Sequence, residues 1–321
     1  LSGSSVAASV AIGGVLIPME EKEGYDKKFA AAVNIASAPT GLIIPPSGIL
    51  IIYPVLAGCS VVGMIMSGYI PGLMWALACM VVAYVIAKKN HYPTAGKVPA
   101  SVFFKYFVDA IPSLLLIVII VGGVMSGIFT ATESAAVAVA FTLFLSIVVY
   151  RSIKIKDLPK ILLDACETTA VIMFLIAGSN VMSFVMSFTG LPSAIGNALI
   201  SVSSNKYVIL LIINLVLLVV GCFMDITPAV LIFTPIFLPV VQSFGMDPIH
   251  FGIMMVMNLG IGNITPPVGS SLFSGCSVAD MDMEDMIKPI LPFYAAIFVA
   301  LMLVAYVPWF SMALPTLFGA V

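Results

Sequence analysis

The sequence Gly41-Leu-Ile-Ile-Pro45-Pro46-Ser47 returns 221 residues later as Gly262-Asn-Ile-Thr-Pro266-Pro267-Val268. Each copy places two adjacent prolines inside a long apolar stretch, where they interrupt any helix that would cross a membrane. Further positions match at the same spacing: Pro18 with Pro239, Gly24 with Gly245, and Asp26 with Asp247. A duplicated unit with a broken apolar helix in each copy is the best sequence pointer to the binding site of a secondary transporter.

The composition places most of the chain in a lipid bilayer. Hydrophobic residues make up 61% of the chain and charged residues only 9%, whereas soluble domains contain about 25% charged residues. Apolar runs long enough to span a bilayer occur at 68–87, 111–128, 134–150, 206–224 and 289–311. We therefore predict an all-α polytopic membrane protein. The net charge of −2 excludes nucleic acid as a partner, and five cysteines without CxxC spacing indicate buried thiols.

The lysines and arginines predict the orientation of the chain. If 28–57 crosses once and 68–87 returns, all basic residues except Lys206 lie on one side, which the positive-inside rule makes cytoplasmic. Residues 1–17 then form the tip and returning arm of a hairpin that opens inward, whereas 206–242 form a hairpin that opens outward. We therefore expect inverted repeats with two re-entrant hairpins and two proline-broken helices, the plan of carriers that alternate access around a central site.

These segments predict a division of the chain. The transport region is expected to comprise the first repeat, 1–67, and the second repeat, 206–285, with scaffold helices and interfacial arms at 68–205 and a terminal membrane helix at 286–321. Amphipathic stretches at 60–67, 98–109 and 153–166 are expected to lie along the cytoplasmic interface or to brace the moving part, and 153–166 fits an ordinary connecting helix equally well. The chain has no initiator Met, and its first copy lacks the apolar residues that precede the second copy. We therefore expect it to be part of a longer polypeptide, whose front is missing or forms a further chain.

The double prolines also predict cation sites. They remove four amide donors and so free carbonyl groups one turn earlier, near 40–43 and 261–264. Inside a membrane every backbone polar group needs a partner. Freed carbonyls beside hydroxyl groups form an oxygen cage that suits Na⁺. The first cation group is predicted to contain Ser4, Ser5, Gly41 and Pro45, and the second cation group Asp225, Thr227, Gly262 and Thr265. Because the offset pairs Ser4 with Asp225, we expect each hairpin tip to face its own broken helix.

The same breaks predict a site for an anionic substrate. Half-helices that start near Ser47 and Val268 would direct positive dipole ends into one space, where they attract carboxylates. The substrate contacts are expected from Ser2, Ser4, Ser47, Asn263 and Thr265. Structural roles stay open for single positions, because Ser and Thr hydroxyls often bond only to their own helix and one proline often gives only a kink.

Several motifs together resemble one family, the large membrane subunit of tripartite ATP-independent periplasmic (TRAP) transporters. They are Leu1-Ser-Gly-Ser-Ser-Val-Ala, Gly24-Tyr-Asp26, Ile44-Pro-Pro-Ser47, Thr130-Ala-Thr-Glu133-Ser134-Ala and Gly262-Asn-Ile-Thr-Pro-Pro267. The likeness extends over essentially the whole chain and is strongest to members that carry sialic acid or C4-dicarboxylates.

The resemblance implies a mechanism and partners. Such subunits are Na⁺-coupled importers of the bacterial inner membrane and work by an elevator-type movement. They act with a small four-helix membrane subunit and with a periplasmic substrate-binding protein that delivers a carboxylate solute. At least two Na⁺ ions are expected at the two cation groups. This chain departs from the family because the residues before the first hairpin tip are absent.

Other functions remain as alternatives to the tripartite importer. The nearest is a stand-alone Na⁺/dicarboxylate symporter, which shares the inverted plan but needs no binding protein. An intramembrane hydrolase would use Ser4 or Asp225, but the sequence shows no base positioned to activate either side chain. A pure channel fits poorly with two broken helices and no ring of charges. We therefore expect a transporter and no enzyme activity.

Overall fold

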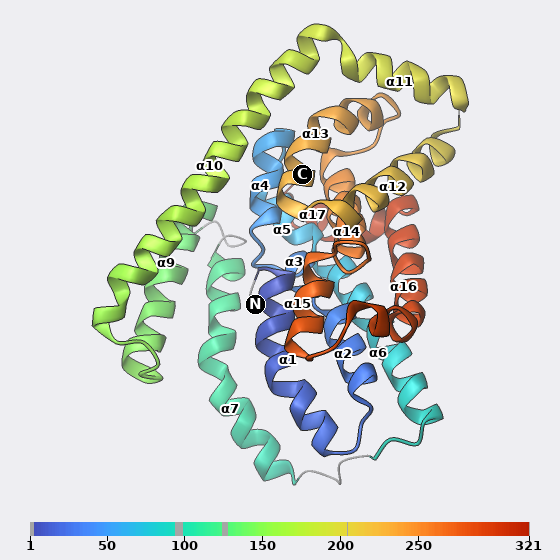
Figure 1. Ribbon diagram of the computed structural model, residues 1–321. Helices are drawn as coiled ribbons and strands as arrows, with labels where there is room; N and C mark the ends of the chain where they lie inside the picture. The colour runs from blue at the N-terminus through green and yellow to red at the C-terminus, as the bar shows by residue number, and fades with distance from the viewer. Residues whose placement is uncertain (1–2, 94–98, 124–127, 204, 321) are drawn as a thin grey trace. The chain divides into compact units, whose positions relative to one another are not determined.

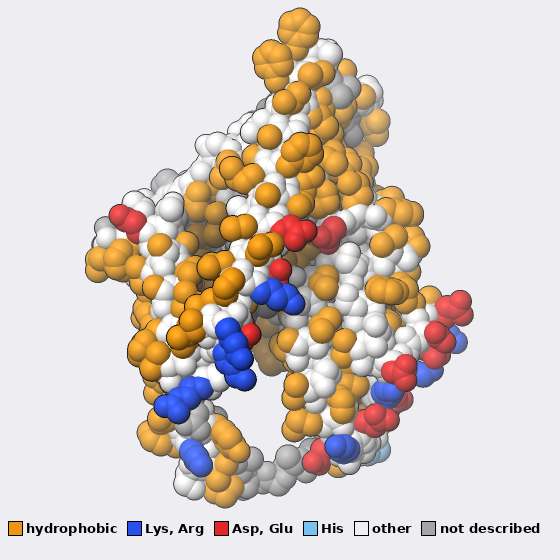
Figure 2. Space-filling model, turned by 60° about the vertical axis from the view of Figure 1, so that its left-hand side comes forward, with side chains coloured by type: hydrophobic (Ala, Val, Ile, Leu, Met, Phe, Trp, Pro, Cys, Tyr) orange, Lys and Arg blue, Asp and Glu red, His pale blue; other side chains and the backbone are white. Residues whose placement is uncertain are grey.

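The computed structural model describes residues 3–93, 99–123, 128–203 and 205–320, and every regular element in these ranges is helical (Figure 1). By length and composition, six of the described helices could cross a membrane, or seven if the bent pair 100–112 and 114–120 forms one span. Figure 2 shows apolar side chains over much of the face in view, as a surface in contact with lipid requires. The prediction of an all-α polytopic membrane protein is confirmed.

The chain forms two compact units, residues 1–93 with 179–321 and residues 94–178. The helices that lie in the first unit are α1 (Ser5–Lys22), α2 (Lys27–Ser37), α3 (Thr40–Ile43), α4 (Ile49–Ala57), α5 (Val61–Ser67), α6 (Tyr69–Lys89), α11 (Leu191–Val202), α12 (Lys206–Phe223), α13 (Ile226–Ser243), α14 (Pro248–Asn263), α15 (Ser270–Val278), α16 (Met283–Tyr306) and α17 (Trp309–Leu317). The second unit contains α7 (Ala100–Ile117), η1 (Val118–Gly122), α9 (Ala131–Phe144), η2 (Leu145–Val149), η3 (Ile155–Asp157) and the start of α10 (Leu158–Thr189).

The two stretches that repeat in sequence have matching helix boundaries. Helices α1 and α13 begin and end 221 residues apart, and so do α4 and α15. The same caps recur, because the carboxylate of Asp26 accepts the amide of Lys28 at 2.7 Å and that of Asp247 accepts the amide of Ile249 at 2.8 Å. Such side-chain caps satisfy amides that have no partner within the first helical turn.

Both double prolines interrupt a helix as predicted. Each pair is joined by a cis peptide bond, and each lies between two helical pieces, α3 and α4 in the first copy and α14 and α15 in the second. We call residues 44–48 the first break and residues 265–269 the second break. The half-helices after the breaks start at Ile49 and Ser270, two residues later than expected.

One of the three stretches expected at the interface or as a brace does not lie at an interface. Residues Val61–Ser67 form α5, in which Gly63, Met64, Met66 and Ser67 are buried. Helix α5 continues almost directly into α6, and together they form one apolar stretch of 29 residues, Val61–Lys89. The stretch 60–67 carries no charged residue, so nothing opposes its burial in the protein.

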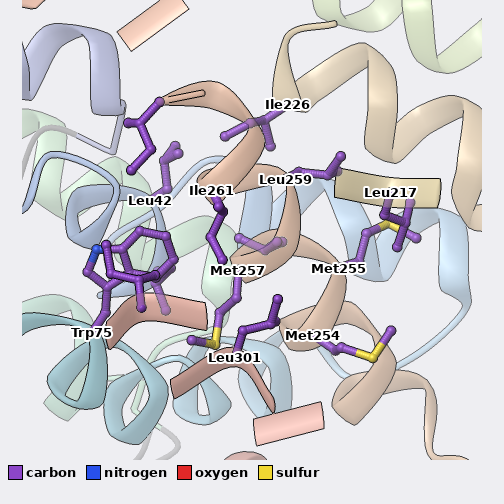
Figure 3. Packing of buried hydrophobic residues seen from close by; sticks show 14 of the residues in the cluster. Leu42, Trp75, Leu217, Ile226, Met254, Met255, Met257, Leu259, Ile261 and Leu301 are labelled. Atoms are coloured by element: carbon purple, nitrogen blue, oxygen red, sulfur yellow. The ribbon is translucent and has the colours of Figure 1, made fainter. Parts of the chain in front are cut away.

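Helix α14 lies at the centre of the first unit. All of its residues from Ile249 to Asn263 are buried, and the methionines Met254, Met255 and Met257 pack among side chains from several other helices (Figure 3). Flexible thioether side chains fill irregular gaps between helices well. The helix that leads to the second break is therefore enclosed by protein, whereas Pro267 and Val268 of the break itself are exposed.

A glycine pair lets α12 approach α14 closely. A Cβ atom added to Gly262 would lie 2.4 Å from the carbonyl carbon of Gly221, which is shorter than any real contact. Lipid is as apolar as a leucine side chain, so helices in a membrane associate through close packing, which small residues permit. This glycine pair brings the end of α12 against the second break.

Candidate functional site at the two helix breaks

The second break is held against the end of α12 by its backbone. The amides of Val268 and Gly269 donate to the carbonyl oxygen of Cys222 at 3.2 and 3.4 Å. Gly269 has φ +44°, a left-handed conformation in which a Cβ would also lie 2.8 Å from the carbonyl oxygen of Thr265. Only glycine fits this position without strain. The tip of the second hairpin thus faces its own broken helix, as expected.

Side chains satisfy part of the backbone at the second break. The Thr265 hydroxyl donates to the carbonyl oxygen of Ile261 at 2.6 Å, and the Tyr294 hydroxyl of α16 donates to that of Ile264. The Ile261 carbonyl also accepts the amide of Ile264, at 3.2 Å, so these side-chain bonds add to the backbone bonds at the end of α14. Two members of the second cation group, Gly262 and Thr265, thus lie together where α14 meets the second break.

The other two members of the second cation group lie at the start of α13. Asp225 precedes this helix, and its carboxylate makes no capping bond there. Its contact with the Ser270 hydroxyl of α15 is long, at 3.5 Å, and the residue is exposed. Thr227 is half-buried in the first turn of α13. Because the Asp225 carboxylate is exposed and its hydrogen bond to Ser270 is long, it is available to bind a cation beside the second break.

The first break contains an unsatisfied oxygen atom, and a cavity lies beside α3 just before it. Gly41 lines a cavity of about 320 Å³ together with Asn34, Ser37 and Thr40, and Pro45 is buried. Ser47 is only 2% exposed, yet its hydroxyl oxygen has no hydrogen-bond partner. A buried polar atom without a partner costs about 1–3 kcal/mol, so Ser47 marks a position where a ligand atom would be favourable.

The start of α1 touches both breaks. Ser4 caps the helix by accepting the amide of Ala7 at 3.3 Å. On one side, a Cβ added to Gly3 would lie 3.4 Å from the carbonyl oxygen of Pro46 in the first break. On the other side, Ser5 bonds to Asn263 and to Ser271, both of the second copy. This tip thus faces its own broken helix, as expected, and in addition bonds to the second copy, which was not expected. Ser2 lies outside the described residues.

Three contributors to the site were not predicted from the sequence. Ser271 follows the second double proline by four residues and could have been found by extending the search for hydroxyl groups into the next helix. Tyr294 lies inside a long apolar run, and Gly221 is one of 25 glycines, so no local pattern distinguishes either residue. Their roles depend on how α12 and α16 pack against the breaks.

The cysteines and the charged side chains suggest no second centre. All five cysteines are free, and no group of three His, Cys, Asp or Glu residues in the described ranges could hold a metal ion. Burial, with a smaller contribution from Asp247, raises the pKa of the Cys59 thiol to about 11, so it stays protonated at neutral pH. Cys166 is exposed, which contradicts the prediction that every cysteine is buried.

Two helices broken at paired prolines, enclosed by a bundle of apolar helices, define a polytopic membrane transport protein. A family model described as "Tripartite ATP-independent periplasmic transporter, DctM component" matches residues 1–310. The chain belongs to this family. It is therefore a transporter permease, a multi-pass protein of the inner membrane.

Curated relatives match almost the whole chain. It is 50% identical to the uncharacterized protein YgiK of Salmonella typhimurium, over 99% of this chain and 73% of that protein. It is 37% identical to the C4-dicarboxylate TRAP transporter large permease protein DctM of Pseudomonas aeruginosa, over 99% of this chain and 75% of the relative. It is also 37% identical to the sialic acid TRAP transporter large permease protein SiaM of Vibrio cholerae, over 99% and 74%.

Proposed function

We propose that this protein carries out Na⁺-coupled import of a carboxylate solute, delivered by a periplasmic binding protein, through an elevator-type alternating-access mechanism. The observation that carries the proposal is the convergence of both breaks on residues 3–5 at the start of α1. Each break holds a buried oxygen atom without a partner, the hydroxyl of Ser47 in the first and the Oδ1 atom of Asn263 beside the second. Unsatisfied oxygens at converging helix breaks support a ligand site.

The chemistry of the breaks supports Na⁺ as the coupling ion. The available groups are backbone carbonyls, hydroxyls and the carboxylate of Asp225, all of them oxygen ligands that a hard cation prefers. The first cation group would bind one Na⁺ and the second cation group another, so we propose at least two ions. The exposed carboxylate of Asp225 supplies the only formal charge among these residues.

The half-helices after the breaks support an anionic substrate. Helices α4 and α15 begin directly beyond the two breaks, so their positive dipole ends lie at the breaks, where they favour a carboxylate. Ser47, Asn263 and Thr265, with Ser2 and Ser4 from the hairpin tip, would then contact the carboxylate. The names of the relatives support this class, because they specify C4-dicarboxylates and sialic acid.

The mechanism follows from the arrangement of the copies. The constant offset of the helix boundaries and the distribution of basic residues support inverted repeats that open toward opposite sides. We propose that 1–67 and 206–285, which share one compact unit, form the moving transport region. The scaffold proposed at 68–205 includes the whole of the second unit, and 286–321 adds the terminal helices.

The partners follow from the family description, which names a tripartite and periplasmic transporter. We propose a small four-helix membrane subunit and a secreted substrate-binding protein as the other two components, together with any further polypeptide that supplies helices before the first hairpin tip. The binding protein would select the solute, because the residues at the breaks offer mostly backbone and hydroxyl groups.

Uptake into proteoliposomes tests the proposal. The complete polypeptide would be reconstituted with its small subunit. Radiolabelled sialic acid or C4-dicarboxylates would then be added outside the proteoliposomes together with the binding protein. Uptake should require both the binding protein and an inward Na⁺ gradient, and an equal K⁺ gradient serves as the control. Uptake that needs Na⁺ but no binding protein would instead establish a stand-alone symporter. Uptake that is independent of Na⁺ would contradict the coupling.

A further inference from the structure

A buried cluster of three polar side chains connects the first hairpin tip to the second copy. The Nδ2 atom of Asn263, the last residue of α14, donates to the hydroxyls of Ser5 and Ser271 at 2.8 and 3.0 Å. The two hydroxyls also lie 2.5 Å apart and share a hydrogen bond. All three residues are at most 2% exposed, so water does not compete for these bonds.

The hydrogen bonds fix the orientation of the Asn263 side chain. Its amide has two N–H groups, and each of them is used by one of the serines. The Oδ1 atom therefore points away from the serine pair, and it is buried without a partner. If the Ser271 hydroxyl were removed, one N–H group would lose its acceptor and the amide would be free to turn. Ser271 thus positions an oxygen atom at the second break without itself lying in either cation group.

Through the same cluster, the second copy also holds the tip at the first break. Ser5 is bonded to the second copy, and two residues earlier Gly3 packs against Pro46 and Ser47 of the first break. Ser4, a member of the first cation group, lies between these two contacts. A shift of the tip at Ser5 would therefore move Ser4 relative to the first break, because only two peptide units separate Gly3 from Ser5.

The positions equivalent to the cluster contain no polar side chain. At the 221-residue offset, Ser5 corresponds to Ile226, Asn263 to Leu42 and Ser271 to Leu50. These three residues are buried in the hydrophobic core. These equivalent side chains cannot form hydrogen bonds. Of the two sets of residues, the Ser5–Asn263–Ser271 set can therefore bond a hairpin tip to the other copy and the apolar set cannot. Apolar side chains suffice for packing at the equivalent junction, so the polar cluster adds a directional contact that packing there does not need.

We infer that the Ser5–Asn263–Ser271 cluster couples the two cation groups, so that occupancy of one raises the affinity of the other. Ser271 acts as a positioning residue in this coupling. The inference rests on the proposed function, because it requires two Na⁺ ions. Coupling between two binding sites is reciprocal, and typical values change affinity by about 5- to 150-fold. Loss of the cluster should therefore make Na⁺ binding weaker and less cooperative.

Direct Na⁺ binding to the purified complete polypeptide with its small subunit tests the inference. Radiolabelled Na⁺ would be titrated in a scintillation proximity assay, with wild type, Ser271→Ala and Ser274→Ala compared. Ser274 is the matched control because it lies on the same helix, and its hydroxyl bonds only to the Ser270 carbonyl of that helix. Wild type and Ser274→Ala should give a Hill coefficient above one. Ser271→Ala should bring it toward one and raise half-saturating Na⁺ about fivefold.

The outcomes separate a coupling role from a structural one. If Ser271→Ala lowers the melting temperature but leaves the Hill coefficient and half-saturation unchanged, the cluster is structural and the inference is overturned. If wild type binds no Na⁺, the proposed coupling ion is wrong and the inference falls with it. Should the alanine variant not fold, Ser271→Cys keeps the size of the side chain with a weaker hydrogen-bonding group and gives the same test.

Discussion

The two breaks lie between helices with matching boundaries, but they differ in their hydrogen bonds to other helices. At the second break, amides of Val268 and Gly269 bond to the end of α12, and Tyr294 satisfies a carbonyl group from α16. At the first break, the Ser47 hydroxyl is buried without a partner, and Gly41 lines a cavity of about 320 Å³. The second break is therefore held by hydrogen bonds to other helices, although Pro267 and Val268 also line a cavity, of about 420 Å³, and Asn263 beside them has an unsatisfied oxygen atom. At the first break, the unsatisfied oxygen atom belongs to Ser47 of the break itself.

The difference arises from side chains at equivalent positions. Asn263 and Thr265 of the second copy correspond to Leu42 and Ile44 of the first, whereas Ser47 of the first corresponds to Val268 of the second. Prolines and glycines at one spacing give both copies the same interruption of the helix. The polar side chains are distributed unequally over that plan, so the two breaks differ in chemistry although the helices around them have matching boundaries.

The largest effect is expected from adding a methyl group at the glycine that follows each double proline. Gly269→Ala should destabilise the protein by about 2–3 kcal/mol, because its positive φ disfavours a side chain and the Thr265 carbonyl lies in the way. At the equivalent Gly48, φ is −61° and nothing lies within 4 Å of an added Cβ. Gly48→Ala should therefore stay within about 0.5 kcal/mol of wild type. Thermal unfolding in detergent measures the stability of both variants. Equal losses of stability would show that the two glycine positions tolerate a side chain equally well.

A smaller effect is expected from the charge that distinguishes the two hairpin tips. Asp225→Asn should raise the Na⁺ concentration for half-maximal uptake about tenfold, because the proposed second cation group loses its carboxylate, worth about 1.4 kcal/mol. Asp247→Asn is the control, since Asp247 caps α14 and Asn replaces it well in that role. Unchanged Na⁺ activation in Asp225→Asn would remove this residue from the site.

The smallest effect is expected at Tyr294, whose hydroxyl bonds to a carbonyl group beside the second break. Tyr294→Phe keeps the packing but removes the bond to the Ile264 carbonyl, which should cost about 1 kcal/mol. Leu73 of α6 serves as a control because it is 56% exposed, so Leu73→Ala should leave the melting temperature nearly unchanged. If both variants melt as wild type does, the Tyr294 bond contributes nothing to the closure of the second break.

Sequence reasoning succeeded where the signal is local. The double prolines located both breaks, the apolar runs located most spanning helices, and the short motifs around the prolines and at Thr130–Ser134 indicated the family. It failed where a segment has no charge pattern, as in 60–67, where half of the residues are buried inside the protein rather than at an interface. The two cation groups, the Na⁺ coupling and the elevator movement remain proposals that the breaks support.

The sequence by itself determined the helices, their interruptions and the family, because prolines, glycines and apolar runs act on the few residues around them. Only the tertiary structure decided which side chains meet at the breaks. Ser5 is 258 residues from Asn263 and 266 from Ser271, and nothing local to α1 indicates that its first residue bonds to the other copy. Contacts over such separations depend on how whole helices pack, and that packing is set by the sum of many small surfaces rather than by any motif.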